Sequence, residues 1–158
     1  MQELIINSDA DEVKIRILFY IYEQHKDSRK MSIFTKIISG EIPSYKVAEN
    51  VDFIAFLDIN PNAKEHTLVV PKKELNKLFD LSRDEYQKLM DFSYTVAKAL
   101  ENTLPCKRVG MSVVGLEVPH VHVHLIPLNE MADIQFVQKV RLSNDEFIAL
   151  ADSISKNI

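Results

Sequence analysis

The chain has 158 residues, 46% of them hydrophobic, and a formal net charge of −4, which supports one domain with a core and no nucleic-acid footprint. The single cysteine, Cys106, excludes an intrachain disulfide and a multi-cysteine metal cluster. No apolar stretch reaches the 18 or so residues of a membrane span, so we expect a cytoplasmic protein that binds neither nucleic acid nor membrane.

The first 30 residues differ in sequence pattern from the rest of the chain. Residues 9–26 are predicted to form an amphipathic helix, and the acidic residues around its start argue against a signal peptide. A charged hinge follows at residues 26–30. We therefore expect an N-terminal helical extension, residues 1–30, and a domain formed by residues 31–158.

Short strands and a few helices are predicted in the second part. A short helix is expected from Phe34 to Ser39, ended by Gly40. Strands are expected at Val47–Ala48, Phe53–Asp58, Thr67–Val70, Arg108–Val114 and Val118–Pro127. Two capping boxes, Ser82-Arg-Asp-Glu85 and Ser143-Asn-Asp-Glu146, open a long helix and a C-terminal helix. Clustered strands without βαβ alternation predict an α+β fold, an antiparallel sheet of about five strands with helices on one side.

Three histidines at two-residue spacing are the most informative feature of the chain. They lie in the run His120-Val-His122-Val-His124. In a strand, residues i, i+2 and i+4 point to one face, roughly 7 Å apart from one to the next. Imidazole can be a nucleophile, a proton shuttle or a metal ligand near neutral pH. A purely structural role is the weaker interpretation, because three buried imidazoles need three sets of hydrogen-bond partners.

Two chemical interpretations of the row remain. The outer two histidines lie roughly 13 Å apart along a strand, so a zinc ion needs two of the three and a distant ligand such as His66 or Glu117. Nucleophilic catalysis at phosphorus accounts for all three, with the middle imidazole attacking and its neighbours positioning it. That imidazole must be neutral, with its proton on the nitrogen that faces a backbone carbonyl. We favour the nucleophile.

Three segments also carry a family resemblance. The first segment is the triad run, in which a hydrophobic residue follows each histidine. The second is residues 33–43, and the third combines Phe56–Pro61 with His66–Lys73. Together they resemble the histidine-triad (HIT) family of nucleotide hydrolases and transferases. The resemblance runs from about Ile33 to Pro127, with the motifs in the family's order.

This resemblance implies a role for each motif residue. His122 is the expected nucleophile at the α-phosphate, forming a nucleotidyl-histidine, and His120 is expected to shape the site through its backbone carbonyl. His124 and His66 are expected to face the phosphates, and Asp58 to accept hydrogen bonds from the ribose hydroxyls. The expected walls of the base site are apolar: Ile33, Phe34, Ile37, Phe56, Leu57 and Ile59. The family's architecture also implies a homodimer.

Three positions of this chain lack the residues that form a structural zinc site in many relatives. Those relatives carry two cysteines around the position of Phe34 and a histidine just after the Pro-Lys-Lys run. This chain has Ser32, Thr35 and Glu74 there. We therefore predict no structural zinc, no other metal and no cofactor.

The approach to the triad departs as well. Relatives have a longer, glycine-rich approach with Asn and then Gly-Gln, whereas residues 111–119 are compact here. Leu116 stands where Gln is frequent and cannot bond a phosphate through its side chain. Ser112 is the candidate substitute for the missing Asn. Ser112, Gly115 and Leu116 complete the set of predicted nucleotide-binding residues. Glu117 repels a phosphate if ionised and close, so we expect it to be solvated.

These features predict a metal-independent hydrolase of a nucleoside 5′-monophosphate ester or amide, with adenosine or another purine as the base. Cleavage of dinucleoside polyphosphates shares the nucleophile but needs room for a second nucleoside. Transfer to sugar phosphates is disfavoured, because that branch typically has Pro where this chain has Val121. A non-catalytic nucleotide-binding module stays open because of Leu116 and the compact loop.

Overall fold

A computed structural model describes Arg16 and residues 31–158. The helix predicted over residues 9–26 lies, apart from Arg16, outside the described residues, as does the hinge at residues 26–30. The strands are β1 (Lys46–Glu49), β2 (Phe53–Leu57), β3 (Thr67–Pro71), β4 (Arg108–Ser112) and β5 (Val123–Leu128). The helices are α2 (Ile33–Ile38), α3 (Arg83–Thr103) and α4 (Asn144–Ser155), with short 3-10 helices η1 (Leu78–Asp80) and η2 (Met131–Ile134).

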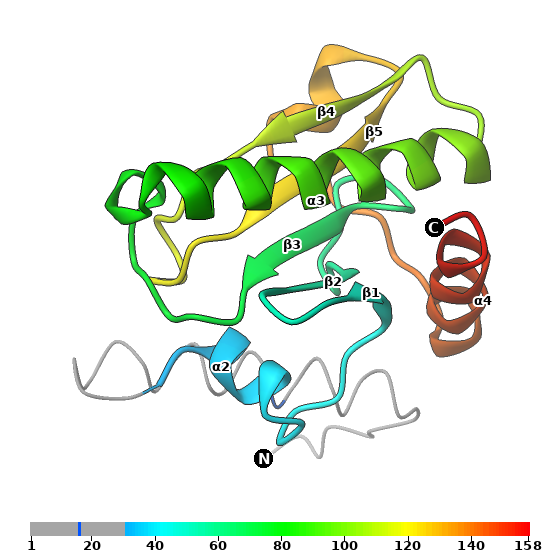
Figure 1. Cartoon of the computed structure of the whole chain (residues 1–158). Coiled ribbons are helices and arrows are strands. Elements are labelled where there is room, and N and C mark those ends of the chain that lie inside the picture. The colour runs from blue at the N-terminus through cyan, green and yellow to red at the C-terminus, as the bar shows by residue number, and fades with distance from the viewer. Residues whose placement is uncertain (1–15, 17–30) are drawn as a thin grey trace.

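The five strands form one antiparallel sheet in the order β1-β2-β3-β5-β4, which confirms the predicted α+β fold (Figure 1). After β3 the chain runs through α3, forms the edge strand β4 and returns as β5 between β3 and β4. The last histidine of the triad, His124, therefore lies in an inner strand, paired with Leu68 on one side and Ser112 on the other.

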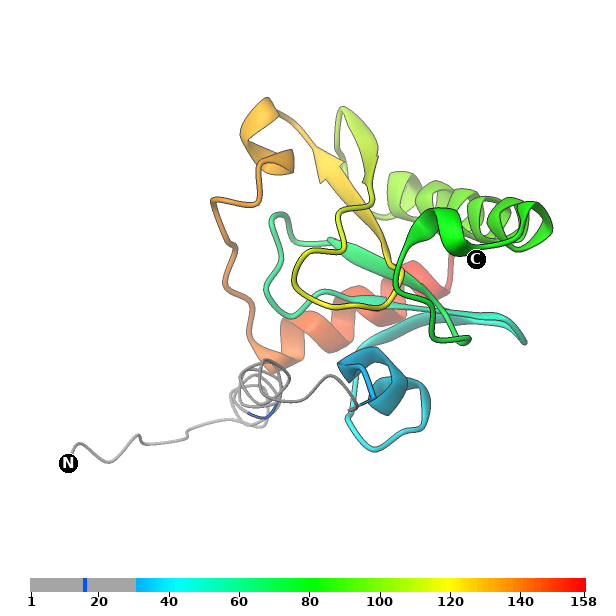
Figure 2. The same cartoon turned by 90° about the vertical axis from the view of Figure 1, so that its left-hand side faces the viewer.

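Both faces of the sheet are covered. In β2, Phe53, Ala55 and Leu57 join the core under α3 and α4, whereas Ile54 and Phe56 pack with α2. Helix α2 thus lies across the sheet from α3 (Figures 1 and 2). The expectation of helices on one side holds for α3 and α4 and is wrong for α2. Every residue of β2 and β3 is buried, so the second face also needs a cover.

Serine caps begin all three α-helices within residues 31–158. The two predicted capping boxes form: the Ser82 and Ser143 side chains accept from the backbone N–H groups of Glu85 and Glu146, and each Glu side chain bonds back. Ser32 caps α2 by accepting from the Thr35 N–H. Ser82 and Ser143 are exposed, but Ser32 is buried. A buried hydroxyl needs a partner for its own proton, and that partner lies in the site.

Strand β5 is shorter than the predicted Val118–Pro127, because its ladder begins only at Val123. The Val121 N–H donates to the Leu75 carbonyl at 2.7 Å. The Pro71 carbonyl bonds to the His120 ring at 2.8 Å. With these groups engaged elsewhere, pairing with β3 cannot extend toward His120. The alternation of faces nevertheless continues, since Val121 joins the core under α3.

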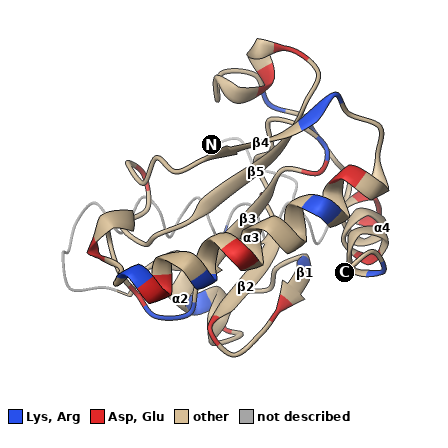
Figure 3. Cartoon of the chain, turned by 45° about the horizontal axis from the view of Figure 1, so that its top comes forward, with Lys and Arg blue, Asp and Glu red and all other residues tan. Residues whose placement is uncertain are grey.

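Charges on the surface are mixed in sign. Basic and acidic residues are interspersed along α3 in the view of Figure 3. Such a surface has no continuous positive stripe along this helix to attract a nucleic acid. Within residues 31–158, no helix has the length and hydrophobicity that crossing a bilayer requires.

Candidate active site

The triad histidines line the sheet face that α2 covers. His120 and His122 lie just before β5 and His124 lies within it, and all three are buried. The ring of Phe34 on α2 packs edge-on against His122 and His120, with centroid distances of 5.0 and 5.9 Å. The structure therefore brings the predicted base-site helix against the predicted nucleophile.

The tautomer of His122 follows from one hydrogen bond. Its Nδ1 lies 2.7 Å from the backbone carbonyl of His120. A carbonyl only accepts, so Nδ1 carries the proton and Nε2 keeps its lone pair. Burial lowers the pKa of His122, although the bond to the His120 carbonyl acts in the opposite direction. The ring is therefore neutral at pH 7, which is the state that nucleophilic attack requires.

His66 and His124 form a second hydrogen-bonded unit. The Asn62 N–H donates to His66 Nδ1 at 3.1 Å, so His66 carries its proton on Nε2. That proton is donated to His124 Nδ1 at 2.9 Å, which leaves the His124 proton on its own Nε2. Burial lowers the pKa of both rings to about 3. His124 therefore presents an N–H donor while both rings stay neutral.

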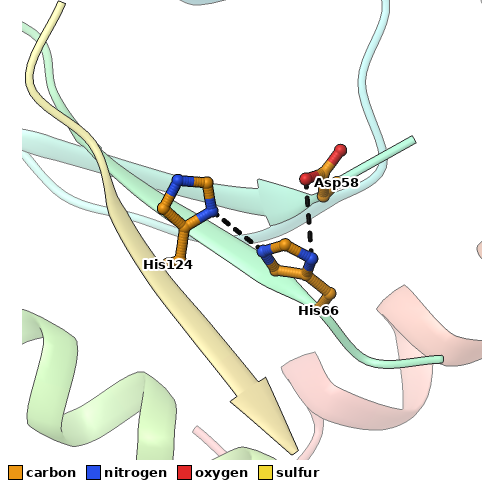
Figure 4. A group of neighbouring side chains, drawn as sticks. All are labelled: Asp58, His66 and His124. Carbon is orange, nitrogen blue, oxygen red and sulfur yellow. Dashed lines mark hydrogen bonds and ion pairs between the residues drawn. The ribbon is translucent and has the colours of Figure 1, made fainter. Parts of the chain in front are cut away.

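Asp58 lies at the end of β2, beside this unit (Figure 4). One carboxylate oxygen accepts the Asn60 N–H at 2.9 Å, and the other is 3.5 Å from His66 Nδ1. His66 is neutral and its Nδ1 lone pair faces Asn62, so this contact is not an ion pair. Burial raises the pKa of Asp58. Its side chain is still 18% exposed, which leaves an acceptor open to a ligand hydroxyl.

Asp58, His66 and His124 are the one trio within residues 31–158 whose ligand atoms lie close enough, within 4.8 Å, to share a metal ion. Figure 4 shows the His66 ring between the other two side chains. Its Nε2 faces His124 and its Nδ1 faces Asp58. A common ion needs a ligand atom from His66, whose two nitrogens are already engaged by the Asn62 N–H and by His124. The trio fits a hydrogen-bonded chain better than a metal site.

Ser32, Thr35 and Glu74, which stand where relatives bind structural zinc, do come together. The Thr35 hydroxyl donates to the Glu74 carboxylate, and the Ser32 N–H lies 3.4 Å from the same oxygen. The Ser32 hydroxyl lies 2.7 Å from His120 Nδ1. Structural zinc is held by thiolates and imidazoles, so two hydroxyls and one exposed carboxylate do not fit it. Hydrogen bonds connect these residues instead.

Most of the predicted base-site residues share the α2 face. The apolar cluster on that face contains Ile33, Phe34, Ile37 and Phe56, with Ile59 packed against it. The assignment of Leu57 is wrong, because its side chain belongs to the core under α3 and α4. The alternation within β2 puts Leu57 on the opposite face from Phe56.

The predicted nucleotide-binding residues before the triad lie in different surroundings. Ser112 ends β4 directly opposite His124. Gly115 adopts a φ of +68°, a left-handed conformation that glycine takes without strain. Leu116 is 88% exposed. Glu117 is exposed, as expected.

Sequence reasoning missed three residues around His66. The ring of Phe136 lies 4.9 Å from that of His124, and its φ of +59° is unusual for a residue other than glycine. Lys139 Nζ donates to the Asn62 side chain at 2.7 Å. Asn62 and Lys139 are 77 positions apart, and neither lies in a periodic segment. No local pattern in the sequence could have joined them.

Comparison with known proteins agrees with this geometry. A family profile described as HIT domain matches residues 39–131. An uncharacterised HIT-like protein of Methanocaldococcus jannaschii is 44% identical over 63% of this chain and 81% of its own length. The adenosine 5′-monophosphoramidase hnt1 of Schizosaccharomyces pombe is 36% identical over 80% of this chain and 97% of its own.

A solved structure supports the same assignment. The crystal structure of a Hit-like protein involved in cell-cycle regulation from Bartonella henselae superposes with a TM-score of 0.72. It is 30% identical and covers 84% of this chain and 98% of its own. The triad, the sheet that carries it and the matched profile lead to one conclusion: this chain belongs to the HIT domain family.

Proposed function

We propose that the protein is a metal-independent hydrolase of nucleoside 5′-monophosphate derivatives, with purine nucleoside phosphoramidates or related AMP esters and amides as substrates. The observation that carries the proposal is the 2.7 Å bond from His122 Nδ1 to the His120 carbonyl, which leaves a lone pair on His122 Nε2. The similarity to an adenosine 5′-monophosphoramidase supports this choice of reaction.

The first displacement makes a covalent intermediate. The His122 Nε2 lone pair forms a bond to the α-phosphorus, and the bond from phosphorus to the leaving nitrogen breaks. The amine leaves with that electron pair and takes a proton from water. His124, which carries its proton on Nε2, donates a hydrogen bond to a phosphoryl oxygen as charge builds there.

The second displacement releases the nucleotide. A water oxygen attacks the same phosphorus, the phosphorus–Nε2 bond breaks, and its electron pair returns to His122. The proton lost by the water replaces the proton that the amine removed in the first step. The products are a nucleoside monophosphate and a free amine, and His122 regains its starting tautomer, because Nδ1 stays bonded to the His120 carbonyl throughout.

The nucleoside part of the substrate is expected to bind against α2. Asp58 offers a partly exposed carboxylate oxygen to the ribose hydroxyls. The cluster that contains Ile33, Phe34 and Ile37 supplies an apolar and aromatic wall for a flat base. A purine buries more surface against such a wall than a pyrimidine does, which favours purine nucleotides.

We also propose that the protein is a homodimer. Strand β4 is an edge of the sheet, with no further strand on its outer side among the described residues. Met111 on this strand and Val114 and Leu116 just after it are exposed. An uncovered edge strand next to apolar side chains favours pairing with a second copy.

The test is AMP release from adenosine 5′-phosphoramidate with EDTA present, for wild type and His122→Ala. We expect wild-type turnover in EDTA and a loss on the order of 10³-fold or more in the variant. Ser143→Ala, which alters only a helix cap remote from the triad, is the control and should keep wild-type activity. Tight AMP binding without turnover by the wild type would instead favour the non-catalytic nucleotide-binding module.

A further inference from the structure

A chain of side chains leads from the surface to the buried His120. The exposed Glu74 carboxylate accepts from the Thr35 hydroxyl, and the Thr35 N–H donates to the Ser32 Oγ at 3.1 Å. The Ser32 hydroxyl lies 2.7 Å from His120 Nδ1. The His120 backbone carbonyl, in turn, accepts the Nδ1 proton of His122. The chain joins α2, the loop after β3 and the segment before β5.

Counting protons fixes the direction of these bonds. His120 Nε2 lies 2.8 Å from the Pro71 carbonyl, which only accepts, so the ring carries its proton on Nε2. His120 Nδ1 is therefore an acceptor, and Ser32 must donate its hydroxyl proton to it. The Ser32 oxygen accepts the Thr35 N–H at 3.1 Å, while the Thr35 hydroxyl proton goes to Glu74. Both nitrogens of His120 thus have partners.

We propose that Ser32 is a positioning residue for the nucleophile and that Glu74 holds Ser32 in place by accepting from the Ser32 N–H and the Thr35 hydroxyl. The Ser32 hydroxyl fixes the His120 ring, and the fixed ring fixes the carbonyl that sets the tautomer of His122. The inference rests on the proposed function, because it assigns the positioning role relative to catalysis by His122.

The alternative is that Ser32 serves only as a helix cap. Ser82 and Ser143 also cap helices by accepting the N–H three residues ahead. Their hydroxyls are exposed and form no bond to a histidine. Ser82→Ala and Ser143→Ala are therefore matched controls: each removes a cap of the same kind and leaves His120 untouched.

The first arm of the test is kinetic and uses adenosine 5′-phosphoramidate. Ser32→Ala is expected to lower kcat by about ten-fold, the usual effect of losing a residue that orients a catalytic group, with KM changed less than about two-fold. The two control variants are expected to keep the wild-type kcat. Equal losses in Ser32→Ala and the controls would overturn the proposal.

Glu74 provides variants that leave the buried part of the site intact. Glu74→Ala removes the acceptor and should lower kcat, whereas Glu74→Gln keeps an oxygen for the Thr35 hydroxyl and should restore most of it. Because the residues act through one chain, Ser32→Ala combined with Glu74→Ala should be no slower than Ser32→Ala alone. Additive losses would contradict a shared path.

The second arm is independent of turnover. Nitrogen-15 NMR of the imidazoles reports the tautomer of His120, whose signals are assigned by their absence in His120→Asn. The wild type should show the Nε2–H form with a hydrogen-bonded Nδ1, and Ser32→Ala should shift the Nδ1 signal. An unchanged signal would refute the Ser32 bond even if the protein proves to have no hydrolase activity, so the two proposals fail separately.

Discussion

Among the four buried histidines of the site, the ring nitrogens are not equally engaged. His66 and His120 each have partners on both nitrogens. His122 and His124 each keep Nε2 without a hydrogen-bond partner among the described residues. Nε2 of His122 carries a lone pair, whereas Nε2 of His124 carries a proton. The two rings therefore offer a nucleophile and a hydrogen-bond donor side by side, with ring centroids 4.8 Å apart.

One buried acid lies outside this scheme. Glu65 is 1% exposed, and neither of its carboxylate oxygens has a hydrogen-bond partner among the described residues. Burial raises its pKa from 4.5 to about 7. Between these values the folded chain holds a proton that the unfolded chain releases. Glu65 therefore destabilises the fold increasingly as the pH rises from about 4.5 to about 7.

The prediction for Glu65 concerns a difference between two pH values. The glutamine in Glu65→Gln cannot ionise, so it does not lose stability as the pH rises. The stability of this variant minus that of the wild type should therefore be higher at about pH 8.5 than at about pH 5, by about 2 kcal/mol. Urea denaturation at both pH values measures this. Glu41→Gln, at an exposed carboxylate, is the control and should show no such difference. A difference of the opposite sign for Glu65→Gln would be inconsistent with a raised pKa.

At the scale of elements, the caps give a prediction that separates stability from function. Ser82→Ala and Ser143→Ala should each lower the free energy of unfolding by about 1 kcal/mol, because each leaves a helix N–H without its acceptor. Ser153→Ala, inside α4, is the comparison, where alanine favours the helix. Urea titration checks the ranking, and a Ser153→Ala protein less stable than both cap variants would count against it.

Elements with local causes were predictable from the sequence. The capping boxes and the two-residue alternation of the strands depend on neighbours within four positions, so α3, α4 and the five strands could be anticipated. The start of β5 could not, because it depends on the Pro71 carbonyl bonding to the ring of His120, 49 positions away. Leu57 has a different cause: the two-residue alternation of a strand already places it on the opposite face from Phe56, so both side chains could not line one base site.

Only those features of the candidate site that depend on neighbouring residues could be predicted from the sequence. The spacing of the triad predicted which imidazoles would share a face, and Asp58 stood out as a carboxylate at the end of an apolar run. The tautomer of His122 depends on a carbonyl only two residues away, whereas the His66–His124 bond, the Ser32 bond and the contacts of Phe136 join segments remote in sequence. No pattern within one segment encodes such contacts.

For the whole molecule, we propose that residues 31–158 are an independent domain and residues 1–30 an extension. Among the described residues, the members of both hydrophobic clusters lie between Ile33 and Ile154. On this proposal, a chain of residues 31–158 should unfold within about 4 °C of the full chain, measured by calorimetry at equal concentration. A larger drop would tie residues 1–30 to the core.

The proposed dimer is tested by sedimentation. The wild type should sediment as a dimer, and Met111→Asp, which puts a charge beside the β4 edge, should sediment as a monomer. Val137→Asp alters an exposed apolar residue outside β4 and should stay dimeric. A monomeric wild type, or a dimer that Val137→Asp disrupts and Met111→Asp does not, would contradict an interface at β4.

The proposed attack of His122 on phosphorus leaves a covalent intermediate, and trapping that intermediate is the sharpest test of the mechanism. Adenosine 5′-phosphoramidate is mixed with excess full-length protein in EDTA, quenched within one turnover, and the peptides are mapped by mass spectrometry. We expect one adenylyl group, attached to His122 in the wild type and absent from His122→Asn. AMP formed at the wild-type rate by His122→Asn, or an adenylyl group on another residue, would contradict it.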